Sequence, residues 1–63
     1  MKDLDDISLM LNLLKEKLEY YKNDEIMLAN VQGQLYALLW VIGEEPEEAW
    51  ELIKRWRQQA QHH

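Results

Sequence analysis

The sequence predicts an all-α protein of three helices, and two observations support this fold class. Apolar residues recur at alternating steps of three and four along most of the chain, which is the period of an α-helix. The pattern breaks at residues 21–25 and 43–46, where the chain carries residue types that end one helix and begin the next. Both connections are short, so neighbouring helices should run antiparallel. We expect one helical domain over residues 1–61, with two long antiparallel helices and a shorter C-terminal helix.

The first helix is predicted over residues 3–21, approximately. Asp3, Asp5 and Asp6 lie near its start, where carboxylates interact favourably with the positive end of the helix dipole. The positions expected to face the core are Leu4, Ile7, Met10, Leu11, Leu14, Leu18 and Tyr21.

The second helix is predicted over residues 24–42, approximately. Asn23 or Asp24 can cap its start by accepting a hydrogen bond from a backbone N–H. Gly43 suits the left-handed backbone position that commonly follows a helix end. The positions expected to face the core are Met27, Leu28, Val31, Leu35, Leu38, Leu39 and Ile42.

The third helix is predicted over residues 46–60, approximately. Pro46 suits the first helical position, where its missing N–H costs nothing. Glutamates at the start, and Lys54, Arg55 and Arg57 toward the end, complement the helix dipole. The core-facing positions are Ala49, Leu52, Ile53, Trp56 and Ala60. The tail of residues 62–63 is two histidines that could remain from a purification tag, so the functional argument leaves them aside.

The first two helices each carry a second apolar strip, on the side away from the expected core. A surface helix of a monomer normally needs one such stripe. Burying about 600 Å² of extra apolar surface would contribute roughly 15 kcal/mol before the cost of association. We therefore expect a homo-oligomeric helical bundle, most simply a homodimer. The expected self-interface consists of Leu9, Leu13, Tyr20, Ile26, Ala29, Gly33, Ala37 and Trp40.

Gly33 lies in the middle of an 18-residue run, Ile26 to Gly43, that contains no charged residue. Glycine inside a helix costs about 1 kcal/mol relative to alanine. The close approach of another backbone can offset this cost, and Ala29 and Ala37 leave the same side of the helix open. Two alternatives remain: Gly33 is simply tolerated, or it packs against the first helix within one subunit.

The composition argues against several classes of protein. The chain has 63 residues, a net charge of −5 and no cysteine, which excludes disulfides and thiolate metal sites. The acidic balance disfavours binding to nucleic acid or to anionic membranes. The uncharged run has polar Asn30, Gln32 and Gln34 at its middle and acidic flanks, unlike a membrane span. The first residues lack the pattern of a secretory signal, so we expect a cytoplasmic protein.

The glutamates around Pro46 are the one constellation that suggests metal chemistry. The segments 44–48 and 47–51 each read E-E-x-x-E, which resembles half of the metal site in all-α nucleotide pyrophosphatases. That resemblance implies a Mg²⁺-dependent nucleotide hydrolase, and such a site needs a second acidic pair, for which only Glu16 and Glu19 are available. Acidic residues at a helix start are also explained by the dipole alone.

The chain has few residues suited to nucleophilic catalysis, because its only serine is Ser8 and its only histidines are the terminal pair. We expect no enzyme activity, no catalytic residues, no metal and no cofactor.

The expected function is a small interaction module, a regulator or adaptor that acts by self-association and partner binding. Partly exposed tryptophans are common at binding hot spots, so Trp50 is a candidate contact, although it could instead cover the turn near Trp40. An alternative is an acidic mimic of nucleic acid, with Asp3, Asp5 and Asp6 as part of its surface. The other candidate partner-binding residues, shared by both interpretations, are Glu44, Glu47, Glu48 and Glu51. Such a chain would suit a phage, plasmid or bacterial accessory protein.

Overall fold

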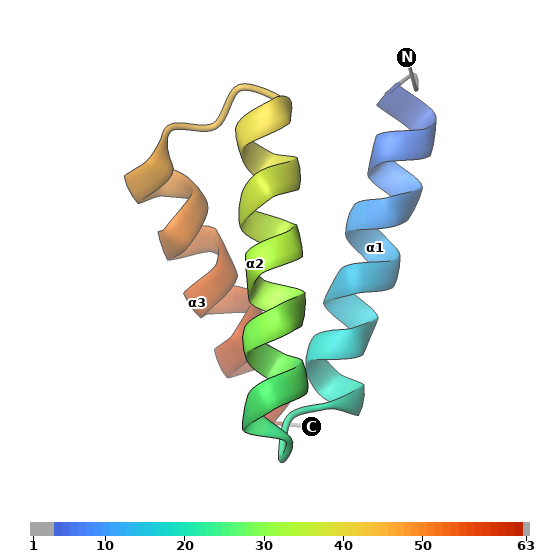
Figure 1. Cartoon of the computed structure of the whole chain (residues 1–63), viewed down its shortest axis with the longest axis vertical. Coiled ribbons are helices and arrows are strands. Elements are labelled where there is room, and N and C mark those ends of the chain that lie inside the picture. The colour runs from blue at the N-terminus through green and yellow to red at the C-terminus, as the bar shows by residue number, and fades with distance from the viewer. Residues whose placement is uncertain (1–3, 63) are drawn as a thin grey trace.

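The structure, a computed structural model, describes residues 4–62, and these form three α-helices joined by two short turns (Figure 1). α1 spans Leu4–Tyr20, α2 spans Glu25–Val41 and α3 spans Pro46–Gln61. Consecutive helices run antiparallel, so α1 and α3 begin at the end of the bundle where α2 ends (Figure 1). The third helix is hardly shorter than the others, with 16 residues against 17. Asp3 and His63 lie outside the described residues.

Asp24 caps the start of α2. Its backbone is extended, and its carboxylate accepts a hydrogen bond from the backbone N–H of Met27 at 3.1 Å. This bond satisfies one of the N–H groups that have no partner in the first turn of a helix. Of the two capping residues that the sequence allowed, Asp24 is therefore the one that acts.

Gly43 ends α2 in the way the sequence predicted. Its φ angle is +99°, in the region that side-chain-bearing residues rarely adopt. The N–H of Gly43 donates to the carbonyl of Trp40, and the N–H of Glu44 donates to the carbonyl of Leu39, both at 3.0 Å. This pair of bonds is the Schellman motif, which satisfies carbonyls at the helix end and turns the chain toward α3.

α3 begins at Pro46, as predicted, with Glu47 and Glu48 in its first turn. The preceding Glu45 has extended backbone and makes no capping hydrogen bond with its side chain. The helix continues to Gln61, so its last turn contains no basic residue. The expectation that arginines and a lysine would complement the end of this helix is wrong, because the helix outlasts them by a full turn.

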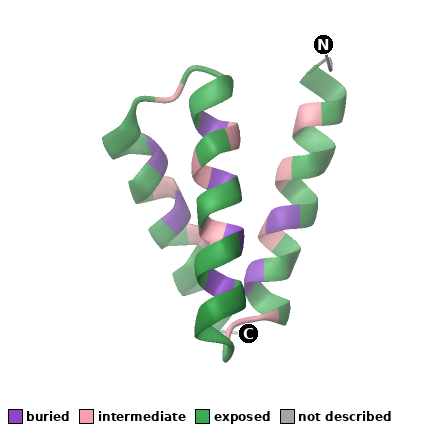
Figure 2. Ribbon diagram, viewed as in Figure 1, coloured by how far each residue is buried: buried purple, intermediate pink, exposed green. Residues whose placement is uncertain are grey.

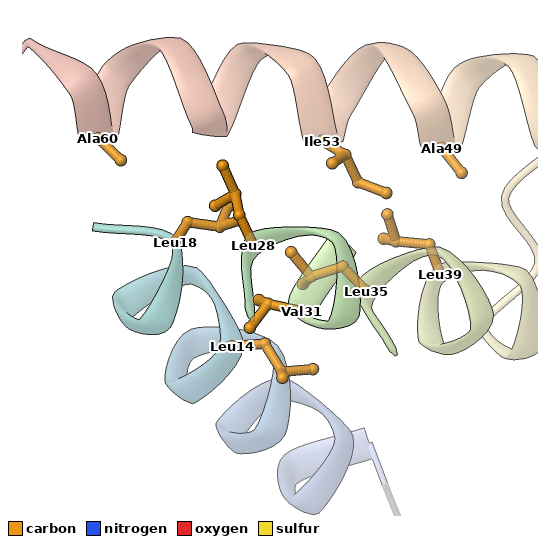
Figure 3. Packing of buried hydrophobic residues seen from close by; sticks show 9 residues of the cluster. All are labelled: Leu14, Leu18, Leu28, Val31, Leu35, Leu39, Ala49, Ile53 and Ala60. Carbon is orange, nitrogen blue, oxygen red and sulfur yellow. The ribbon is translucent and has the colours of Figure 1, made fainter. Parts of the chain in front are cut away.

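A small aliphatic core lies where the three helices meet (Figure 2). In Figure 3 the side chain of Ala49 points toward Leu39, while Ala60 points toward the pair formed by Leu18 and Leu28. The small alanines let α3 lie close to α1 and α2, and a helix pair packs tightest where side chains are small. The buried residues are Leu14, Leu18, Leu28, Val31, Leu35, Leu39, Ala49, Ile53 and Ala60.

The first half of α1 is less covered than its apolar pattern predicts. Leu4 is 74% exposed and Met10 is also exposed, whereas Leu14 and Leu18 are buried. α3 meets α1 near the end of α1, and the two helices lie on opposite sides of α2 where both begin (Figure 1). The early turns of α1 therefore have only α2 to pack against, which corrects the expectation for Leu4 and Met10.

Candidate association surface

Five residues follow one another along the side of α2 that faces away from the core, and we call this side the outer face of α2. All are exposed, including two large side chains: Ile26 is 83% exposed and Trp40 is 65% exposed. The opposite side of the same helix carries all four of its buried residues. The outer face consists of Ile26, Ala29, Gly33, Ala37 and Trp40.

Gly33 has no packing role within the chain. A Cβ atom built on it would meet no atom within 4 Å, apart from its immediate neighbours and its own helix backbone. This result removes the interpretation that Gly33 allows α1 to approach α2 inside one subunit. Within one copy, the cost of a glycine at mid-helix has no compensating contact among the described residues.

A shallow groove runs from the outer face of α2 toward the start of α3. Ala29 and Gly33 contribute to its lining, with Tyr36 from α2, and with Pro46 and Trp50 from α3. Its volume is about 610 Å³, and it is open to solvent on one side. An open apolar groove beside an exposed helix face forms one wider surface that a second molecule can cover.

Two aromatic rings hold α2 and α3 together at this groove. The centroids of Tyr36 and Trp50 are 5.8 Å apart and their planes meet at 80°, an edge-to-face contact. Trp50 remains 43% exposed. The sequence analysis offered a position near Trp40 as one of two interpretations of Trp50. It did not single out Tyr36, whose position at the border of the core-facing stripe gave no periodic signal.

The strip on α1 forms a second surface. Leu9, Leu13 and Tyr20 are all exposed, as the two-stripe pattern predicts. Leu9 and Leu13 line a hollow of about 320 Å³ between α1 and α2, which Leu38 also lines. Tyr20 lies outside this hollow and lines a separate depression with Leu13, Glu16, Lys17 and Tyr21. Of the eight expected interface residues, three are thus exposed on α1 and five form the outer face of α2.

The expected acidic site gathers at the start of α3. Glu44, Glu47, Glu48 and Glu51 line one depression, together with Arg55. Glu51 also pairs with Lys54 at 3.6 Å, although both side chains are largely exposed. A cation within the same depression lowers its negative potential, and an exposed pair of this kind adds little stability.

Within residues 4–62 there is no assembled metal site, because no three carboxylate or imidazole groups there lie close enough to share an ion. Glu16 and Glu19 belong to the last part of α1, whereas α3 begins at the opposite end of the bundle (Figure 1). The second acidic pair that a hydrolase would need is therefore far from the first.

Charge is divided unequally between the two ends of the bundle. The end where α1 and α3 begin carries seven carboxylates, with Lys54 and Arg55 at its border: Asp5, Asp6, Glu44, Glu45, Glu47, Glu48 and Glu51. The other part carries four cations: Lys15, Lys17, Lys22 and Arg57. It also carries four carboxylates: Glu16, Glu19, Asp24 and Glu25. One end is thus net negative, whereas the positive and negative groups of the remainder balance.

Comparison with known proteins yields no significant match to a family model, a curated protein or a solved structure. None of the three helices in residues 4–62 has the length and apolar character needed to cross a membrane.

Proposed function

We propose that the chain is a small helical interaction module, a regulator or adaptor that works by self-association and not by catalysis. The observation that carries this proposal is the outer face of α2, which is exposed along its whole length and bears no charged residue. Contiguous apolar surface with large exposed side chains such as Ile26 and Trp40 is typical of protein–protein contacts.

Gly33 supports the same proposal by energetics. A glycine at the middle of a helix costs about 1 kcal/mol relative to alanine. Nothing within one copy uses the space beside Gly33. A second helix crossing at this point would use it, because the absence of a Cβ lets two backbones approach closely.

The strip on α1, with Leu9, Leu13 and Tyr20, is proposed as the further contact of the assembly or of a partner protein. Trp50 extends the outer face of α2 into the neighbouring groove and is proposed as an anchor there. A cytoplasmic location belongs to this proposal, since a chain without cysteine gains nothing from an oxidising compartment.

Light scattering during size-exclusion chromatography tests the proposal directly. The native chain should elute with at least twice its monomer mass of 7.6 kDa at micromolar concentration. Gly33→Leu should return the mass to that of the monomer without loss of helical content, because a side chain there meets nothing inside one copy. Gln58→Leu, at an exposed position of α3, is the matched control and should keep the native mass. A native chain of 7.6 kDa would refute self-association.

A second candidate function is the acidic mimic of nucleic acid, which is supported by the gathering of seven carboxylates at one end. Arg55 within the depression at the start of α3 weighs against it. A mimic should displace double-stranded DNA from DNA-binding proteins of the same host. A variant with glutamine at the four lining glutamates should lose this activity while keeping the native mass. No displacement by the native chain would remove the candidate.

A further inference from the structure

The residues of the outer face of α2 are arranged symmetrically about Gly33. Gly33 is the middle residue of Glu25–Val41. Ala29 and Ala37 lie four residues on either side of it, and Ile26 and Trp40 lie seven residues on either side. Small side chains thus occupy the centre of the face, and a large side chain stands at each end. This pattern suits a two-fold axis that passes beside Gly33.

Two copies can meet on this face in two ways, because identical surfaces pair about a two-fold axis. In a parallel pair every residue opposes its own copy, so Trp40 would crowd against the partner's Trp40. In an antiparallel pair Ala29 opposes the partner's Ala37, and Ile26 opposes the partner's Trp40. At each end of the antiparallel contact, therefore, the medium-sized Ile26 of one copy meets the large Trp40 of the other.

The distribution of charge distinguishes the two arrangements. A parallel pair would bring the seven-carboxylate ends of both copies together. An antiparallel pair sets each acidic end beside the part of the partner in which cations and carboxylates balance. Like charges held within a Debye length of about 8 Å repel appreciably at physiological salt. The dipoles of the two α2 helices also attract each other when the helices run in opposite directions.

The positions of the neighbouring helices α1 and α3 also favour the antiparallel pair. The axis of an antiparallel pair lies across α2 within the contact plane, so α3 falls on the same side as the partner's α3. Glu47 and Glu48 at the start of α3 then lie toward the end at which the partner's α3 carries Arg57. In the parallel arrangement α3 would instead fall beside the partner's α1, and both of these helices begin with carboxylates.

We infer that two copies of this chain associate antiparallel through the outer face of α2, about a two-fold axis at Gly33. This inference rests on the proposed self-association and adds its geometry. The occupant of the groove and of the outer face is therefore a second, reversed copy of the same chain. The contact is isologous and closes on itself, so this face joins two copies and no more.

Disulfide trapping tests the orientation, because the native chain contains no cysteine. Ala29→Cys and Ala37→Cys are each oxidised alone and then as an equimolar mixture. In the antiparallel pair Ala29 lies about 12 Å along the helix from the partner's Ala29, since each residue rises 1.5 Å. That separation is too long for a disulfide, which needs Cα atoms about 4.4–6.8 Å apart. The mixture should therefore cross-link, whereas each variant alone should not.

Gly33→Cys is the matched control, because Gly33 opposes the partner's Gly33 in both orientations. Cross-linking of Ala29→Cys with itself would overturn the antiparallel arrangement and leave self-association intact. Cross-linking of Gly33→Cys without any from the mixture would equally overturn the proposed register. Light scattering of the reduced variants distinguishes a wrong orientation or register from a failure of self-association. If the chain does not self-associate, every variant has the monomer mass.

Discussion

The Tyr36 ring of α2 meets the Trp50 ring of α3 edge to face, with centroids 5.8 Å apart. Both residues also line the open groove whose lining includes Gly33. Aromatic pairs of this geometry contribute about 0.5–1.5 kcal/mol beyond the area they bury. One contact therefore stabilises the fold and shapes the proposed interface.

A double-mutant cycle should recover this coupling. Tyr36→Leu and Trp50→Leu should each lower the free energy of unfolding, and the double variant should lose about 0.5–1.5 kcal/mol less than the sum of the two. Urea denaturation at one fixed protein concentration measures it, because association adds stability that depends on concentration. Additive losses would show that the two rings do not interact.

Leu35→Ala should unfold much of the population. Leu35 is fully buried at the centre of the core, and replacing a buried leucine with alanine typically costs about 2–5 kcal/mol. Leu4→Ala is the matched control, since Leu4 is 74% exposed and its loss should cost less than about 0.5 kcal/mol. Circular dichroism against urea concentration provides both values. Equal losses at the two sites would contradict the observed burial.

Asp24→Ala should lower stability by about 1 kcal/mol, because it removes the acceptor for the N–H of Met27. Asn23→Ala, at the adjacent position, should have little effect because Asn23 lies outside the helix and is exposed. Thermal unfolding measures the difference, which should be about 4–8 °C for a domain of this size. A larger loss of stability from Asn23→Ala than from Asp24→Ala would show that Asp24 is not the capping residue.

The two glycines should respond to alanine with opposite signs. Gly43→Ala forces a side chain into a φ of +99° and should destabilise the chain by about 1 kcal/mol. Gly33→Ala should stabilise a single copy by up to about 1 kcal/mol, because the new methyl group meets nothing and alanine favours the helix. The comparison is made at a dilution where the chain is monomeric, with thermal unfolding as the readout. Two changes of the same sign would contradict it.

Local features were predictable because they depend on neighbouring residues. The cap at Asn23 or Asp24, the turn at Gly43 and the start at Pro46 follow from the backbone preferences and side-chain groups of single residues. The exposed strips were predictable for a related reason, since helical periodicity separates Ile26 and Trp40 from Leu35 whatever the helix packs against.

Contacts between helices were not predictable in the same way. The partner of Trp50 is Tyr36 and not Trp40, and the ammonium group of Lys15 lies 4.6 Å from the centre of the Trp56 ring. Such pairs depend on the angle at which two helices cross, and residues far apart in the sequence determine that angle.

By itself, the sequence determined that this protein is three helices, where each begins and ends, and that its second helix is apolar on two sides. Only the tertiary structure decided how far each core-facing stripe is covered within one copy, leaving Leu4 and Met10 exposed. The physical reason is that periodicity is a property of one helix, whereas burial depends on where the other two helices lie. One α3, packed against one side of α2 and the end of α1, cannot cover the remaining apolar surface.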